Sequence, residues 1–247
     1  MGHYTPTILI LQDANSAAQK VADMMQQAIE EKPNLVLGLA TGGTPVATYR
    51  ELVRRHEKED LDFARVRSFN LDEYVGLSSD HPQSYRVFMR QQLFDHINID
   101  PENTYVPDGL ADDVTNHAQQ YESLIASEGG IDLQLLGIGQ NGHIAFNEPG
   151  SAGDSRTREI ELTQRTIDSN SRFFESASDV PRTAITMGIG TILEAKSIVL
   201  LATGESKAQA IRKLMADDPH EQNPASYLKT HPNVTIVLDH DAAASMV

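Results

Sequence analysis

The sequence predicts an α/β protein in which a mostly parallel central sheet carries helices on both faces. Short, continuously apolar runs recur along the chain, as expected for strands that are buried on both faces. Segments with helical spacing of apolar residues alternate with these runs. We find no internal repeat, low-complexity tract or Pro/Gly/Ser linker that would divide the chain. We therefore expect a single domain over residues 1–247.

The strands are predicted from apolar runs of strand length, namely TILIL, LVLGLA, VRSFNL, IDLQLLGIG, SIVLLATG and VTIVLD. The helices are predicted from helical periodicity, with Ser16 as the N-cap of the first and Pro33 just past its end. In chain order we expect strand 7–11, helix 16–31, strand 35–40, helix 45–58, strand 66–71, helices 84–96 and 114–127, strand 131–139, strand 197–204, helix 205–215 and strand 234–239. A segment without clear periodicity lies between residues 140 and 180.

Composition narrows the possible functions. The chain has no cysteine, which excludes disulfides, zinc–thiolate sites and a cysteine nucleophile. Its net charge of −15 disfavours binding to nucleic acid or to an anionic membrane surface, although a local pocket can still be positive. The first residues lack the layout of a secretory signal, and no apolar run approaches the roughly 20 residues of a membrane span. We expect a cytoplasmic protein.

Polar and glycine-rich segments follow several of the predicted strands. These segments are 41–44, 72–73, 140–148 and 204–207. Ligands of open parallel sheets bind outside the carboxyl ends of the strands. The sequence therefore predicts that four loops converge on one crevice.

The first loop, Thr41-Gly42-Gly43-Thr44, leads from a strand into a helix that begins near Pro45. We expect Thr44 to cap this helix. Two glycines let the backbone approach a ligand closely, and a helix N-terminus attracts anions. The segment matches neither nucleotide-binding glycine pattern, so it predicts a phosphate site without indicating a nucleotide. A tight, well-capped turn without a ligand fits the same residues.

A lysine follows a later strand, in the segment Thr203-Gly204-Glu205-Ser206-Lys207. A cation in the first turn of a helix opposes the helix dipole, and phosphate binding would explain its presence. A solvated surface lysine is the alternative.

Two carboxylates, Asp72 and Glu73, come directly after the strand 66–71. A carboxylate at the mouth of a crevice is partly desolvated, which raises its pKa towards the range useful for a base. An ordinary acidic loop is the alternative.

The loop LGIGQNGHIAFNEPGS places His143 among three glycines, with Glu148 five residues later. The carboxylate can orient the imidazole, so that the pair exchanges protons near neutral pH. A structural histidine is the alternative. A metal site would need a third ligand, and we find none at the usual spacing, so we expect neither a metal nor a cofactor.

In the segments that contain these residues, and over nearly its whole length, the chain resembles the glucosamine-6-phosphate deaminase family. The matching runs are LGLATGGTP, FNLDEYVGL, GIGQNGHIAFNEPGS, NSRFF at 170–174 and TGESKA at 203–208, in the family's order and spacing. The resemblance implies a Rossmann-like three-layer α/β sandwich. It also implies isomerisation and deamination of glucosamine 6-phosphate with water, giving fructose 6-phosphate and ammonia.

The resemblance implies a role for each site residue. The turn formed by Thr41, Gly42, Gly43 and Thr44 would hold the 6-phosphate together with Arg172 and Lys207. His143 would open the pyranose ring, and Glu148 would orient His143. Asp72 would move a proton from C2 to C1, and Tyr85 would pack over the substrate. A lid at about 150–185, carrying Arg172, would close on binding.

Three departures from the family pattern concern catalysis and regulation. Asn141 stands where some members carry an aspartate, and an amide cannot act as a base, although it can hydrogen-bond. Ile160 stands where allosteric hexameric members have a lysine, and the chain stops at Val247, short of their C-terminal extension. The last two argue against activation by N-acetylglucosamine 6-phosphate and against the hexamer. A monomer and another homo-oligomer both stay open.

The sequence also fits two alternatives. A 6-phosphogluconolactonase-like hydrolase of the same fold would need no base for a C2 proton. A sugar-phosphate sensor would bind without catalysis, but such sensors usually carry a DNA-binding domain, for which this chain has neither the length nor the charge.

Overall fold

A seven-stranded sheet forms the centre of the computed structural model, which describes residues 2–246 apart from 172, 173, 175, 177 and 178. Its paired strands all run parallel. Across the sheet the order is β1 (Thr7–Leu11), β10 (Val234–Asp239), β9 (Ser197–Ala202), β6 (Leu133–Leu136), β2 (Val36–Leu39), β3 (Arg67–Asn70) and β5 (Thr104–Tyr105). The predicted α/β class with a mostly parallel sheet is confirmed.

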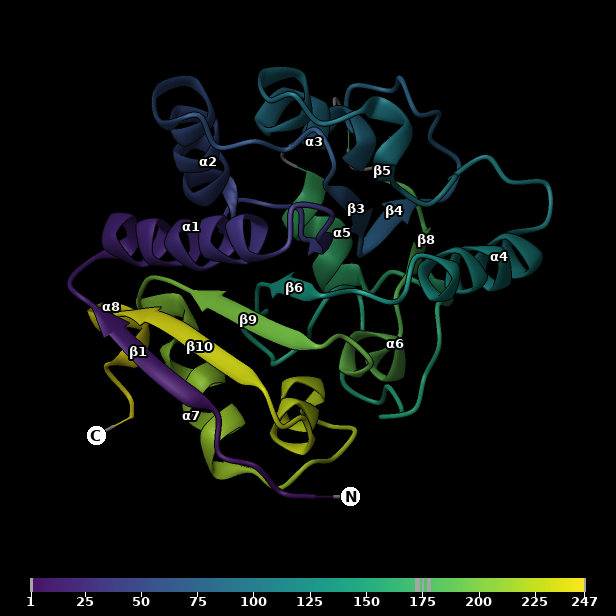
Figure 1. The fold of residues 1–247 in the computed structure, drawn as a ribbon. Coiled ribbons are helices and arrows are strands. Elements are labelled where there is room, and N and C mark those ends of the chain that lie inside the picture. The colour runs from purple at the N-terminus through teal and green to yellow at the C-terminus, as the bar shows by residue number, and fades with distance from the viewer. Residues whose placement is uncertain (1, 172–173, 175, 177–178, 247) are drawn as a thin grey trace.

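Helices cover both faces of this sheet (Figure 1). One layer contains α1 (Ala14–Glu31), α2 (Val46–Glu59) and α3 (Tyr85–Gln92), and the other contains α4 (Val114–Ser127), α6 (Ile189–Leu193), α7 (Ala208–Ala216) and α8 (His240–Ala243). Strand side chains alternate between two apolar cores. In β9, Val199 and Leu201 join the core under α1 and α2, whereas Ile198 and Leu200 join the core under α7. Each fully buried aliphatic side chain contributes about 1.5–3 kcal/mol.

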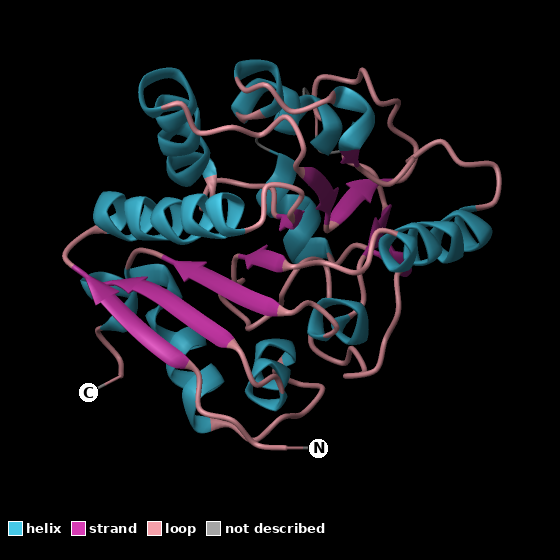
Figure 2. Ribbon diagram, in the orientation of Figure 1, coloured by secondary structure: helices cyan, strands magenta, loops and turns pink. Residues whose placement is uncertain are grey.

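A second, three-stranded antiparallel sheet was not predicted from the sequence. It consists of β4 (Asp72–Tyr74), β8 (Thr183–Thr186) and β7 (Arg158–Glu161), in the order β4-β8-β7. Only Leu71 separates β4 from β3, so one apolar run supplies strands to both sheets. The segment 140–180, which lacks clear periodicity in the sequence, contains β7 and the short helix α5 (Gln164–Asn170). Figure 2 shows these shorter strands beyond the long strands of the central sheet.

The connections place a crevice at the middle of the main sheet. From β2 the chain passes through α2 to β3 on one side, whereas from β6 it continues to β9 on the other side. Because β2 and β6 are neighbours, the loops that follow them diverge at the carboxyl end of the sheet. Such a switch point is the usual ligand site of an open α/β sheet.

The ends of several helices differ from the predictions. Asp13, not Ser16, caps α1, because its carboxylate accepts the Ser16 N–H at 2.7 Å. Pro45, not Thr44, is the N-cap of α2, and it gives no side-chain cap hydrogen bond. The predicted helix 84–96 ends as a separate 3-10 turn, and the predicted helix 205–215 begins as one. In the described part of the chain, the 3-10 helices are η1 (Phe94–His96), η2 (Pro101–Asn103), η5 (Glu205–Lys207) and η6 (Pro224–Thr230).

The longest described helix, α1, has 18 residues and presents a polar outer face. None of the helices in the described part of the chain has the length and apolar character needed to cross a membrane.

Candidate active site

A pocket of about 640 Å³ lies at the carboxyl ends of the central strands. The loops after β2, β6 and β9 line it, together with the start of β4, the first residue of α3 and part of α5. Every predicted site residue that the structure describes borders this one pocket, namely Thr41, Gly42, Gly43, Thr44, Asp72, Tyr85, Asn141, His143, Glu148 and Lys207. Arg172, which we also expected at the site, lies outside the described residues.

The turn after β2 faces the pocket through its backbone. Gly42 has a φ of 101°, a conformation that side-chain-bearing residues rarely adopt. A Cβ atom added at Gly42 or Gly43 would have no described atom within 4 Å, so both residues border open space. Tyr49 anchors the start of the turn, since its buried hydroxyl donates to the carbonyl oxygen of Ala40 at 2.6 Å. The turn is thus fixed at its base and open towards a ligand.

Lys207 brings a cation to the same pocket from the end of η5. Its Nζ donates to the carbonyl oxygen of Ile138 at 2.7 Å, just beyond β6. The turn before it is tied to β10, because the Gly204 N–H donates to the Asp239 carboxylate at 2.9–3.0 Å. These contacts hold Lys207 between the ends of neighbouring strands, where it can pair with an anionic group.

Asp72, the first residue of β4, is only 6 % exposed. Burial, and then the charge of Glu73, raises the pKa of Asp72 from 3.8 to about 8, while a long hydrogen bond from Thr41 at 3.5 Å opposes the rise. Burial also raises the pKa of Glu73, but the backbone N–H groups of Tyr74, Tyr85 and Arg86 donate to its carboxylate at 2.9–3.1 Å and favour its charged form. The proton is therefore held on Asp72, which can exchange it near neutral pH. The alternative of an ordinary acidic loop is wrong for this pair, because both residues belong to a buried strand.

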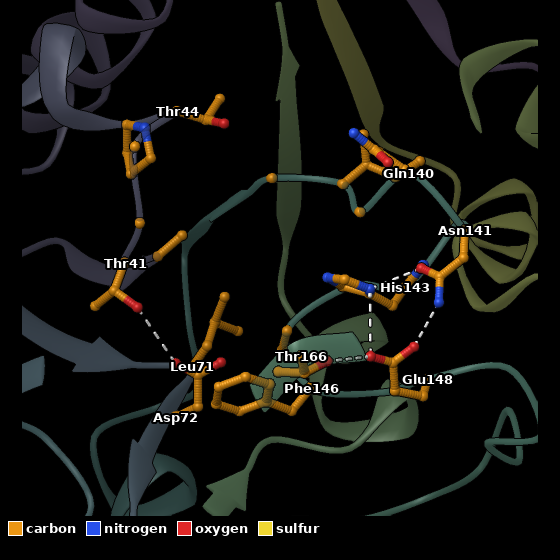
Figure 3. A pocket seen from close by; sticks show the side chains of 18 of the residues that line it. Thr41, Thr44, Leu71, Asp72, Gln140, Asn141, His143, Phe146, Glu148 and Thr166 are labelled. Carbon is orange, nitrogen blue, oxygen red and sulfur yellow. Dashed lines mark hydrogen bonds and ion pairs between the residues drawn. The ribbon is translucent and has the colours of Figure 1, made fainter. Parts of the chain in front are cut away.

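Across the pocket from Asp72, Asn141 links His143 to Glu148 (Figure 3). Asn141 Oδ1 lies 2.7 Å from His143 Nδ1, and Asn141 Nδ2 donates to Glu148 Oε2 at 2.6 Å. An ionised carboxylate only accepts hydrogen bonds, so the NH₂ group of Asn141 must face Glu148 and its oxygen must face His143. Nδ1 of His143 therefore carries the hydrogen, which leaves Nε2 of the neutral ring as the proton acceptor.

Glu148 remains ionised in this arrangement. Burial raises its pKa, but the neighbouring His143 ring outweighs burial, and hydrogen bonds from Asn141 and Thr166 lower the pKa further, to about 2. Glu148 Oε1 lies 3.6 Å from His143 Nδ1 and accepts from Thr166 Oγ1 at 2.8 Å. The group formed by His143, Asn141 and Glu148 can accept and return one proton at Nε2.

Glycines shape the loop that carries this group. A Cβ atom at Gly139 would lie 2.1 Å from the His143 ring, so the imidazole packs directly on the Gly139 backbone. A Cβ atom at Gly142, where φ is 87°, would lie 2.4 Å from Asn223 Oδ1. Ala145 also has a positive φ, of 50°. This close packing sets the direction of the imidazole.

Aromatic side chains form another wall of the pocket. Tyr85 stacks on Phe146 with ring centroids 6.1 Å apart, and its hydroxyl donates to the Tyr74 hydroxyl at 3.3 Å. Burial raises the pKa of Tyr85 well above 10, so the phenol stays neutral and does not act as a base. The wall can pack against the carbon face of a ligand.

Sequence reasoning missed the residues that α5 contributes to the pocket. Thr166 and Asp168 both line it, and Thr166 contacts Glu148. No sequence pattern marks them, since they come from the segment without clear periodicity. Among the described residues, no group of three His, Cys, Asp or Glu side chains is arranged to hold a metal ion.

Comparison with known proteins identifies relatives of this fold and site. A family model described as glucosamine-6-phosphate isomerases/6-phosphogluconolactonase matches residues 12–237. Glucosamine-6-phosphate deaminase from Rhodopirellula baltica is 55 % identical over 240 residues, covering 97 % of this chain and 95 % of the relative. The corresponding protein from Thermoanaerobacter pseudethanolicus is 48 % identical over 237 residues, covering 96 % of this chain and 94 % of the relative.

Solved structures agree with this relationship. A monomeric glucosamine-6-phosphate deaminase superposes with a TM-score of 0.95 at 47 % identity, covering 97 % of this chain and 99 % of the other. A 6-phosphogluconolactonase from Trypanosoma cruzi, at 22 % identity, superposes with a TM-score of 0.80 over 100 % of this chain and 98 % of the other, and shares the fold alone. The chain belongs to the glucosamine-6-phosphate isomerase/6-phosphogluconolactonase family.

Proposed function

We propose that this chain converts D-glucosamine 6-phosphate and water into D-fructose 6-phosphate and ammonia. One observation carries the proposal: two groups suited to proton transfer, Asp72 and His143, border a single pocket that also contains an anion-binding turn and a lysine. The relatives with about half of their residues identical are named as deaminases of this sugar phosphate. Each chemical step of the conversion is a proton transfer or the addition of water, which positioned acids and bases catalyse by about 10²–10⁴-fold per group.

The 6-phosphate would bind at the turn Thr41–Thr44 and at Lys207. Gly42 and Gly43 leave space for an anion to approach the backbone, and the N-terminus of α2 adds a favourable dipole. Lys207 adds a positive charge. We assign Arg172 to the same phosphate as a proposal from the family resemblance.

His143 would open the sugar ring. Its Nε2 carries the lone pair when Asn141 holds the hydrogen on Nδ1. Nε2 takes the proton of the anomeric hydroxyl and returns it to the ring oxygen, and the C1–O5 bond breaks to give the open-chain aldehyde. Glu148 stabilises the imidazolium that forms between these two transfers.

Asp72 would then move the proton that defines the isomerisation. As a carboxylate it takes the proton from C2 of the open chain while the ammonium group on C2 passes a proton to O1, which gives an enol with a neutral amine on C2. As a carboxylic acid it delivers a proton to C1. The pKa of about 8 lets one group do both near neutral pH. The resulting imine at C2 adds water and releases ammonia, leaving the ketone.

We propose that the segment 150–185 acts as a lid within this single domain. α5 from this segment contributes Thr166 and Asp168 to the pocket, so its position affects access to the site. Closure over the substrate would exclude water from the proton-transfer steps. Hydrogen exchange of the backbone of α5 should slow when a non-reactive sugar phosphate binds, and an unchanged exchange rate would contradict the lid.

We further propose that the enzyme works in the cytoplasm as a monomer without N-acetylglucosamine 6-phosphate activation. The structural relative at 47 % identity is described as monomeric. Ile160 packs against the apolar cluster of the second sheet, so this position offers no positive charge. Sedimentation and kinetics with the N-acetylated sugar phosphate test this proposal, and a hexamer with activation would refute it.

Ammonia release from glucosamine 6-phosphate, coupled to detection of fructose 6-phosphate, tests the main proposal. The same protein should be inactive on 6-phosphogluconolactone. Hydrolysis of the lactone without ammonia release from the amino sugar would replace the deaminase by a lactonase.

A further inference from the structure

Glu148 receives a hydrogen bond from a part of the chain outside its own loop. Thr166 lies in α5, 18 residues beyond Glu148, and its hydroxyl is 2.8 Å from Glu148 Oε1. The Thr163 hydroxyl lies 3.0 Å from the Thr166 hydroxyl and only 3.5 Å from the same carboxylate oxygen. Figure 3 shows Thr166 beside Glu148, on the side of Glu148 that also faces His143.

The hydrogens that each of these groups can donate determine the direction of the hydrogen bonds. Glu148 is ionised and accepts only, so the single hydroxyl hydrogen of Thr166 points to Oε1. The Thr163 oxygen accepts the Thr166 N–H at 3.2 Å, and its own hydrogen is then available to the Thr166 oxygen at 3.0 Å or to Glu148 Oε1 at 3.5 Å. A chain of donors from the first turn of α5 thus ends on Oε1, and each donor polarises the next.

This chain of hydrogen bonds affects the spacing within the catalytic group. Oε1 is the carboxylate oxygen nearest His143 Nδ1, yet the two atoms are 3.6 Å apart. The Asn141 amide bonds Nδ1 at 2.7 Å and the other carboxylate oxygen, Oε2, at 2.6 Å. The hydrogen bond from Thr166 holds Glu148 Oε1 at this distance from His143 Nδ1, so the Asn141 amide is the direct hydrogen-bond partner of Nδ1.

We propose that Thr166 is a positioning residue for the proton transfer at His143. Its hydroxyl holds Glu148 Oε1 away from His143 Nδ1 and so keeps Asn141 between the imidazole and the Glu148 carboxylate. Without this hydroxyl, Oε1 moves onto Nδ1–H and forms a direct ion pair when the imidazole takes up a proton. A direct pair stabilises the imidazolium more strongly, so return of the proton to the ring oxygen becomes slower. Because Thr166 belongs to α5, the position of this helix then affects catalysis at His143 as well as access to the pocket.

The test compares Thr166→Val, which keeps the side-chain shape and removes the hydroxyl, with Thr166→Ser, which keeps the hydroxyl. Thr157→Val is the matched control, because the buried Thr157 hydroxyl has no hydrogen-bond partner in the described part of the chain. The first measurement is NMR of the His143 ring, with ¹⁵N-labelled histidine and no substrate. We expect the Nδ1 proton to move downfield in Thr166→Val and to stay at its wild-type position in Thr166→Ser and Thr157→Val. An unchanged Nδ1 resonance in Thr166→Val would overturn the proposal.

The second measurement is turnover, and this part rests on the proposed deaminase function. We expect Thr166→Val to lower kcat on the closed-ring substrate roughly tenfold with little change in KM, because the lost bond ends on a charged group. Turnover of an open-chain analogue should be reduced much less, and Thr166→Ser should restore both. Equal losses on the two substrates, or a change confined to KM, would show a structural role and overturn the assignment.

The two measurements separate the proposals. A wild-type protein that releases no ammonia would refute the deaminase function, while the ring resonance would still decide whether Thr166 positions Glu148. If Thr166→Val does not fold, Thr166→Ala removes the same hydroxyl with less bulk and is judged by the same two results.

Discussion

Replacing Asp72 by asparagine is expected to remove activity and to stabilise the protein at alkaline pH. Asp72 is 6 % exposed, and burial together with the charge of Glu73 raises its pKa from 3.8 to about 8. Between these pH values the folded protein binds the Asp72 proton more tightly than the unfolded chain does. The free energy of unfolding therefore falls, through this group, as the pH rises from about 4 to about 8.

The size of the effect follows from the shift. Because a tenfold change in proton affinity corresponds to about 1.36 kcal/mol, the rise of the Asp72 pKa from 3.8 to about 8 sets an upper bound of about 5–6 kcal/mol above pH 8. Relaxation and water entry on ionisation lower this value, and we expect a measured difference of about 2–4 kcal/mol. Asparagine has nearly the same shape and cannot ionise, and its amide oxygen can still accept from Thr41.

Urea unfolding of the wild type and of Asp72→Asn at pH 5 and pH 9 measures the difference. The stability advantage of the variant should grow between the two pH values, while kcat falls by about 10²–10⁴-fold. Asp154→Asn, at an exposed carboxylate, is the control for removal of one negative charge. A stability difference that is the same at both pH values would refute the buried, proton-holding state of Asp72.

Three further substitutions test the other parts of the site. Lys207→Ala should raise KM more than it lowers kcat, because phosphate is bound equally in the ground and transition states, and an unchanged KM would count against the phosphate assignment. His143→Gln should cripple turnover of the closed ring and affect an open-chain analogue much less; equal loss on both would refute the ring-opening role. Gly139→Ala places a Cβ atom 2.1 Å from the His143 ring and should displace it, so that kcat falls at least about tenfold while KM changes little; wild-type kcat would show that the ring direction is not critical.

Elements with strong local patterns were predicted well. The helix 114–127 and the strand 234–239 have the expected bounds, because apolar periodicity and a buried run of β-branched residues mark them clearly. The second sheet was missed, since β4 follows β3 after one residue and the other two strands of that sheet, β8 and β7, are four-residue strands from distant segments. Antiparallel pairing over such separations leaves no local signal.

The sequence predicted those residues of the candidate site that lie in loops directly after buried strands. Glycines, a lysine, a carboxylate and a histidine at strand ends indicated Gly42, Asp72, His143 and Lys207. The contact of Thr166 with Glu148 could not be predicted, because it joins two loops whose relative position only the folded chain sets. The sequence predicted that the pKa of Asp72 is raised, but how far it is raised depends on the burial of Asp72 in β4.

Transfer of a hydrogen isotope from C2 to C1 tests the central claim most directly. In the proposed mechanism, one buried carboxylate, Asp72, removes the C2 proton and delivers it to C1 inside a pocket that limits exchange with water. With glucosamine 6-phosphate deuterated at C2, part of the fructose 6-phosphate formed in the first turnovers should carry deuterium at C1, and Asp72→Asn should form no labelled product. Ammonia release without any deuterium at C1 would contradict transfer by a single shielded base.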